Sequence, residues 1–123
     1  MQLHTSSEAP DQDADDYHND LTNEVANANG YTTGGVTLGS TTNTNTANVV
    51  TFDHADPTPW TATGAGFTAD KGITLDTTPG TSATNPLLWW MDFDGDQTAS
   101  GGGTFTVTMS ASGAATITVG DAP

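Results

Sequence analysis

The sequence predicts a mainly β fold, an antiparallel β-sandwich or jelly-roll-like barrel of about seven or eight strands. Threonine supplies 25 of the 123 residues, and its branched side chain disfavours helices and suits a pleated sheet. Several short segments alternate apolar and polar side chains, which is the period of a strand with one buried face. Glycine, proline and asparagine separate these segments at intervals of roughly 8–15 residues, as is typical of short strands joined by turns.

The strand predictions rest mainly on apolar patterns after residue 30. Residues 104–109 and 115–119 alternate without a fault, and the Ala-Ser-Gly sequence at 111–113 predicts a hairpin between them. Residues 86–93 are apolar on both faces, which is typical of a strand in the middle of a packed structure. Further strands are expected at 2–5, 36–38, 48–53, 60–63 and 67–75. The side chains expected in the core are Val50, Phe52, Trp60, Leu88, Trp90, Phe105, Val107, Ile117 and Val119.

One short helix is expected near the start of the chain. Tyr17, Leu21 and Val25 recur at a spacing of four, and an aspartate at 15 or 16 can cap the first turn. An acidic loop precedes this segment, so that loop and helix together occupy about residues 8–26. The length of 123 residues fits one domain, so we expect residues 1–123 to form a single β-sandwich domain.

Charge excludes several classes of function. Fifteen acids face one base, Lys71, which gives a formal net charge of −14. A nucleic-acid-binding surface needs many lysines and arginines against the phosphates, so no nucleic-acid partner is expected.

No apolar run approaches the ~20 residues of a membrane helix, and no membrane partner is expected. The chain has no cysteine, which excludes disulfides and thiolate metal sites.

The same acidity is open to two interpretations. Low hydrophobicity with high net charge is typical of a disordered chain. The alternative is a folded protein adapted to molar salt, where a Debye length of ~3 Å leaves surface carboxylates little repulsion. Nine aromatic residues and the regular strand patterns favour the folded, halophilic interpretation.

The strongest candidate metal site is the sequence Asp-Phe-Asp-Gly-Asp at 92–96, where Asp92, Asp94 and Asp96 could bind Ca²⁺ or Mg²⁺. Hard cations prefer several oxygen ligands, and these alternate aspartates supply three carboxylates within one turn. The alternative is an ordinary turn between strands, where aspartate and glycine are common. No other cofactor is expected.

Other polar clusters carry weaker hypotheses. The aspartates at 11, 13, 15 and 16 are interpreted as a solvated loop with weak cation binding as the alternative, and His54 between Asp53 and Asp56 as a strand end. His4 and His18 have no partner at a metal-ligand spacing and are interpreted as ordinary polar residues. No nucleophile elbow, zinc-protease motif or phosphate-binding loop occurs, so we expect a protein that is not an enzyme and has no catalytic residues.

A set of short motifs resembles a family of small β-rich structural proteins of tailed viruses. The motifs are Glu24-Val25, the Gly-Tyr-Thr-x-Gly-Gly sequence at 30–35, Pro86-Leu87-Leu88 with Asp92-Phe93, and the Gly-Thr-Phe-Thr-Val sequence at 103–107. The resemblance as a whole covers about residues 13–119. Relatives carry a basic, aromatic stretch where this chain has residues 69–75, which fits a halophilic, haloarchaeal version of the family.

The resemblance implies a virion component that assembles in the host cytoplasm. The role that we expect is a capsid decoration or cement protein, with the major capsid protein or other virion proteins as partners and with copies of the chain forming a homo-oligomer. The alternatives are a head–tail junction or tail ring protein, and a β-sandwich binding module for a host glycan or calcium.

Overall fold

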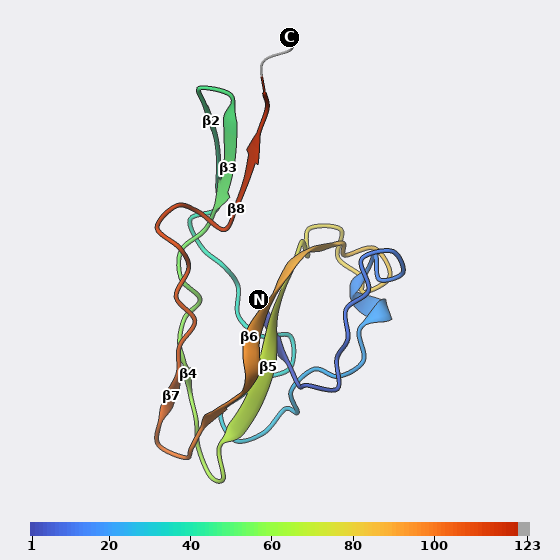
Figure 1. Cartoon of the computed structure of the whole chain (residues 1–123). Helices are drawn as coiled ribbons and strands as arrows, with labels where there is room; N and C mark the ends of the chain where they lie inside the picture. Colours follow the sequence, from blue (N-terminus) through green and yellow to red (C-terminus); the bar gives the residue numbers. More distant parts are fainter. Residues whose placement is uncertain (121–123) are drawn as a thin grey trace. The chain divides into compact units, whose positions relative to one another are not determined.

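The computed structural model describes residues 1–120, whose regular structure is nearly all β (Figure 1). Within these residues the strands form three antiparallel sheets, of order β1-β5-β6, β2-β3-β8 and β4-β7, and none of the three closes into a barrel. The expectation of a mainly β, antiparallel fold is therefore confirmed. The strands are β1 (Gln2–His4), β2 (Thr42–Thr46), β3 (Val49–Asp53), β4 (Trp60–Thr61), β5 (Phe67–Leu75), β6 (Leu87–Ala99), β7 (Thr104–Phe105) and β8 (Ala115–Thr118).

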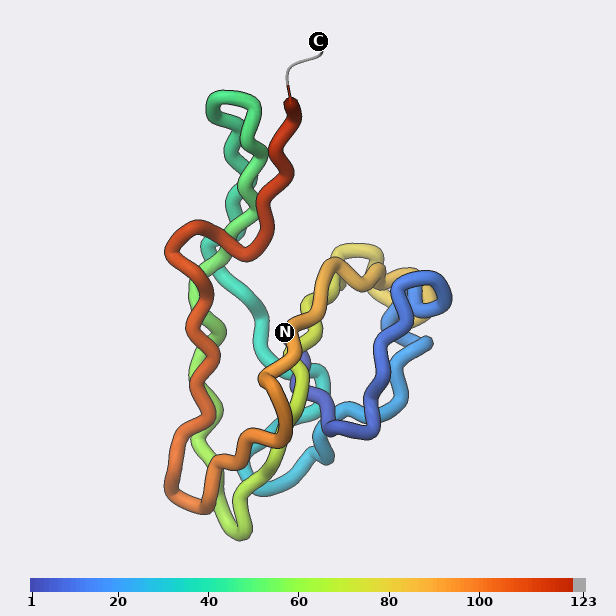
Figure 2. Tube along the Cα trace, in the orientation of Figure 1, coloured from blue at the N-terminus to red at the C-terminus, as the bar shows by residue number. Residues whose placement is uncertain are grey.

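The chain divides into two compact units, each built from two separate segments of the sequence. The first unit comprises Met1–Val36 and Trp60–Phe105, and the second comprises Thr37–Pro59 and the residues from Thr106 onward. Figure 2 follows the chain out of the first unit after Val36 and back into it at Trp60. The expectation of a single domain over residues 1–123 stays a prediction.

In the first unit β5 is the central strand of its sheet. It pairs with β1 on one side and with β6 on the other, and most of its residues are buried. The expectation that residues 86–93 form a central strand is wrong, because β6 lies at the edge of the sheet and pairs only with β5 among the described strands. Its residues up to Phe93 alternate between half-buried and exposed, and the ring of Phe93 lies 5.7 Å from that of Phe105.

An aromatic cluster fills one side of the first unit. The ring of Phe105 lies 5.6 Å from that of Phe67 and 6.2 Å from that of Trp60, measured between centroids. Tyr31 joins the cluster 5.9 Å from Phe67. Aromatic pairs at such separations add to the stability that comes from burial alone. Gly30 precedes Tyr31 with a φ of 96°, and a side chain there would overlap the backbone of Thr61.

The expected helix within residues 8–26 is wrong. The segment holds one turn of 3-10 helix at His18–Asp20, between residues 17 and 21 in extended conformation. Its backbone groups bond to other segments instead: the amide of Val25 donates to Leu3 at 2.9 Å, and that of His18 donates to Asn85 at 3.0 Å. Asparagine, aspartate and threonine are weak helix formers, so pairing with neighbouring segments prevails over the weak apolar periodicity.

The second unit contains the sheet β2-β3-β8. A two-residue turn at Ala47 and Asn48 joins β2 to β3, and both residues have positive φ, as in the tightest hairpins. The expected hairpin between residues 104–109 and 115–119 is wrong, because β7 pairs with β4 and β8 pairs with β3. The threonine-rich strand β2 is exposed throughout, so the sequence at 42–46 forms a sheet edge.

The expected core is correct only in part. Trp60, Phe105 and Val107 are buried, whereas Val50 and Phe52 are half-buried. Four others are among the most exposed large apolar side chains of the described residues: Leu88, Trp90, Ile117 and Val119, with 46–59% of their surface accessible. Large apolar groups are seldom left in contact with water in patches unless a ligand or partner covers them.

Candidate functional sites

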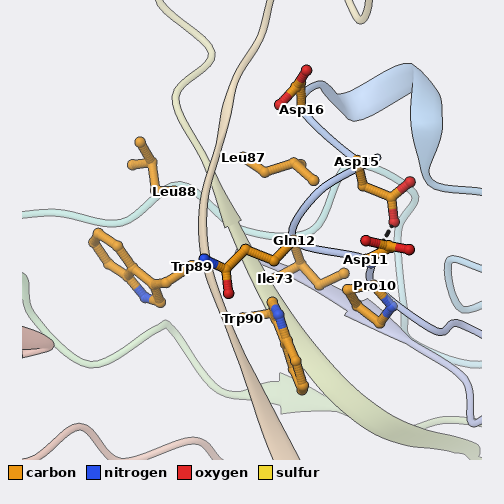
Figure 3. Close-up of a pocket in the computed structure, with 10 residues that line it drawn as sticks. All are labelled: Pro10, Asp11, Gln12, Asp15, Asp16, Ile73, Leu87, Leu88, Trp89 and Trp90. Atoms are coloured by element: carbon orange, nitrogen blue, oxygen red, sulfur yellow. Dashed lines mark hydrogen bonds between the residues drawn. The ribbon is translucent and has the colours of Figure 1, made fainter.

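A pocket of about 400 Å³ lies in the first unit between β6 and the acidic loop. Figure 3 shows its two walls. The apolar wall comes from β6, at 87–90, and from Ile73 of β5. The polar wall comes from Pro10, Asp11, Gln12, Asp15 and Asp16.

A bulge in β6 shapes the apolar wall. Trp90 pairs with Ile73 and Leu87 pairs with Leu75, so that Leu88 is an extra residue in the outer strand. Because Ile73 and Leu75 are two residues apart on β5, they point to the same face, and their partners Trp90 and Leu87 point there too. The bulge thus brings two large apolar side chains, three residues apart in sequence, to the pocket.

The acidic loop is folded by its own hydrogen bonds. The amide of Asp11 donates to Oδ2 of Asp15 at 2.8 Å, and the amide of Asp13 donates to Oδ1 of Asp11 at 2.9 Å. At the end of the loop, the amide of Leu87 donates to the carbonyl of Asp16 at 3.0 Å and ties the loop to β6. The carboxylates of Asp11 and Asp15 are thus held by loop amides at one wall of the pocket. Asp11, Asp13 and Asp16 are exposed, as expected for a solvated loop, and weak cation binding there stays a prediction.

The candidate metal residues Asp92, Asp94 and Asp96 lie at a second bulge of β6. Asp92 pairs with Lys71, and the next pair joins Gln97 to Ala69. Residues 93–96 of β6 therefore lie across from a single residue of β5, Asp70. Asp94 has a φ of 61°, and its amide donates to Oδ1 of Asp92 at 2.8 Å. Among residues 1–120, no three histidine, aspartate or glutamate side chains are arranged to hold a metal ion together. Cation binding at this turn stays a prediction.

Lys71 is the charged partner of this turn. Its ammonium group donates a hydrogen bond to the carboxylate of Asp70. That hydrogen bond raises the pKa of Lys71, and the charges of Asp92 and Asp96 raise it further. The one lysine of the chain is therefore paired with Asp70 and lies within the field of the carboxylates of the acidic turn.

A buried hydrogen-bond network lies at the β1 edge of the sheet, and sequence reasoning missed it. Nδ1 of His4 lies 3.1 Å from Oε2 of Glu8, and both residues are buried. The same glutamate oxygen accepts hydrogen bonds from the amides of Thr22 and Asn23 at 3.0 and 2.7 Å. The amide of Gln2 continues the network towards His18, with 3.0 Å between their Nε2 atoms.

Burial sets the protonation of this network. It lowers the pKa of His4 below 6.5, although the neighbouring Glu8 opposes the shift. Burial also raises the pKa of Glu8, but the hydrogen bonds from Asn23, Thr22 and His4 outweigh it and bring the value below 4.5. The pair ties residues 2–8 to residues 22–23 and has no connection to the pocket lining. Its position, with a histidine and a glutamate four residues apart in a segment that forms no helix, left no signal in the sequence.

The sheet of the second unit has one uncharged apolar face. The register places Val50 opposite Ile117 and Phe52 opposite Ala115, and these residues alternate with Val49 and the threonines of the other face. Asn43 and Asn45 of β2 lie on the same face, where they pair with Phe52 and Val50, respectively. We call these residues, with Val119, the apolar sheet face. Ile117 and Val119 on it are 56% and 59% exposed.

Hydrogen bonds hold residues 53–56, which include His54, in place. Nδ1 of His54 lies 2.8 Å from the carbonyl of Ala55, and the amide of Met109 donates to Oδ1 of Asp56 at 2.8 Å. The carboxylate of Asp56 thus links residues 53–56 to the segment after β7, as expected for the end of a strand.

Comparisons with protein-family models, curated proteins and solved structures give no match. Among residues 1–120, no helix has the length and apolar character needed to cross a bilayer.

Proposed function

We propose that this chain is a structural protein that assembles with further copies of itself through the apolar sheet face. The observation that carries the proposal is an uncharged face with exposed Ile117 and Val119 on a protein of net charge −14. Two copies that meet there bury apolar surface without bringing carboxylates together, which favours this face over the acidic remainder.

The geometry of the sheet suits such an assembly. Two sheets that pack face to face lie ~10 Å apart and fill the space between them with alternate side chains. The β-sandwich that the sequence predicts would then form between copies. The exposed edge strand β2 adds unpaired backbone groups that a neighbouring subunit can complete.

The resemblance to structural proteins of tailed viruses suggests where such an assembly would serve. In that role the chain is a capsid decoration protein of a halophilic virus, held in many copies on the major capsid protein. A head–tail junction ring is the alternative, and the number of copies per particle distinguishes the two.

The experiment compares two charge insertions on neighbouring residues of β8. Ile117→Asp places a carboxylate in the apolar sheet face, whereas Thr118→Asp, the matched control, places the same charge on the opposite face. Sedimentation in molar KCl is expected to show oligomers for the unchanged protein and for Thr118→Asp, and monomers for Ile117→Asp. A monomeric unchanged protein, or equal dissociation of both variants, would contradict assembly through this face.

A further inference from the structure

We propose that the pocket between the acidic loop and β6 binds an organic cation, an ammonium or guanidinium group carried on an apolar or aromatic body. The site lies in the first unit, and binding there does not depend on assembly through the second. A volume of about 400 Å³ falls within the size range of small-molecule sites.

The apolar wall provides a surface for the body of such a ligand and for its charge. Trp90 is 46% exposed although it points to the pocket beside the buried Ile73. The face of an indole ring attracts cations, because its electron density concentrates there. An apolar body against Leu87 and Trp90 would also remove both side chains from water.

The opposite wall provides negative charge at fixed positions. Asp11 and Asp15 each use one carboxylate oxygen to accept a backbone amide of the loop, and a carboxylate accepts further hydrogen bonds through its remaining lone pairs. The carboxylate of Asp16 makes no hydrogen bond to any other described residue and is exposed. All three residues line the pocket, and the remaining lone pairs of their carboxylates can accept N–H groups.

The chemistry of the two walls favours an organic cation over other ligands. Lys71, the one basic side chain, is bound by Asp70 and does not line the pocket, so an anion finds no partner. A sugar needs donors as well as acceptors, and apart from the indoles the lining offers only the amide of Gln12 as a side-chain donor. Among the described residues, no three acidic or histidine side chains, those of the pocket included, are arranged to hold a metal ion together.

The experiment titrates the whole protein, labelled with ¹⁵N, at the lowest KCl concentration that keeps it folded. The probes are benzylammonium, an arginine-containing blocked tripeptide, neutral benzyl alcohol, a neutral tetrasaccharide and CaCl₂. We expect the two cations to shift the amide signals of residues 10–16 and 87–90, and the other probes to leave them unchanged. The tighter of the two cations indicates whether the natural ligand is a free amine or a side chain of a protein.

Matched variants test the two walls separately. Asp16→Asn removes a pocket charge without changing size, and Asp94→Asn removes the same charge from β6 outside the pocket. We expect the dissociation constant for benzylammonium to rise about threefold to fivefold in Asp16→Asn and to stay unchanged in Asp94→Asn. Trp90→Leu keeps an apolar surface but removes the indole, and is expected to weaken binding about threefold to tenfold.

Four results would overturn the proposal. They are binding of benzyl alcohol as tight as that of the cation, shifts caused by the tetrasaccharide or by calcium at the pocket residues in place of the cations, no shift with any probe, and equal weakening by Asp16→Asn and Asp94→Asn.

Discussion

In the first unit, single carboxylate oxygens each accept hydrogen bonds from several donors. Oε2 of Glu8 accepts from His4 and from two backbone amides, and Oε1 of Glu24 accepts from the Tyr31 hydroxyl and the Gly34 amide at 2.6 Å each. The hydrogen bonds to the buried Glu8 stabilise its charged form. Burial, together with the hydrogen bond to Glu24, raises the pKa of Tyr31, so this hydroxyl stays protonated and donates to Glu24 at neutral pH.

At the residue scale, the free energy of unfolding depends on the protonation of His4. Because its pKa in the folded protein is lowered from 6.5, the unfolded chain takes up a proton that the folded protein resists. The contribution is complete above about pH 6.5 and is lost as the pH falls toward the lowered pKa, with a slope of at most about 1.4 kcal/mol per pH unit. The acid limb of Glu8 follows at lower pH, in the same direction.

The measurement is urea unfolding between pH 5 and 7 in molar KCl, which screens the repulsion among the surface carboxylates. His4→Asn, which cannot titrate, serves as the control, and its unfolding free energy is expected to vary less over this range. Equal slopes for the two proteins would show that His4 does not carry the effect.

The elements show which local patterns decide structure and which do not. The mainly β character followed from threonine content and alternation, and β1, β3 and β5 lie close to where those patterns predict them. The predicted helix failed because residues 17–25 bond to Leu3 and Asn85, partners that are distant in sequence. The apolar run at 87–90 was expected in a core, but a bulge and an edge position leave Trp90 exposed at the pocket. Pairing order depends on contacts between distant residues, which no local pattern contains.

At the element scale, the turn at Ala47 limits the stability of the β2–β3 hairpin. Ala47 has a φ of 50°, which costs an alanine roughly 1–2 kcal/mol relative to right-handed backbone. Asparagine tolerates this conformation, so Ala47→Asn is expected to raise the unfolding free energy by up to about 1 kcal/mol. Ala47→Val, with a branched side chain in the same position, is expected to lower it.

Denaturant melts of the three proteins measure both effects. A change in the same direction for asparagine and valine would show that backbone strain at this turn is not the cause.

The whole molecule combines a modest apolar content with extreme acidity. A third of its residues are hydrophobic, and its net charge is −14. Repulsion among these charges opposes the compact state, and salt screens it. The apolar sheet face carries no carboxylate, so association there brings no charged groups into direct contact.

At this scale, the melting temperature is expected to rise with KCl concentration. In dilute buffer the Debye length reaches ~30 Å at ~0.01 M salt, and repulsion extends across the molecule. We expect unfolding or dissociation below a few tenths molar salt. Calorimetry between ~0.05 M and ~2 M KCl measures the change, and a constant melting temperature would contradict adaptation to high salt.

Assembly through the apolar sheet face is tested most directly by hydrogen exchange at two protein concentrations in molar KCl. The account predicts that amides of residues 49–53 and 115–118 exchange more slowly at the higher concentration, because association stabilises the sheet that they form. Amides of β5, in the first unit, are expected to exchange at the same rate at both concentrations. Exchange in the β2-β3-β8 sheet that is independent of concentration would contradict the account.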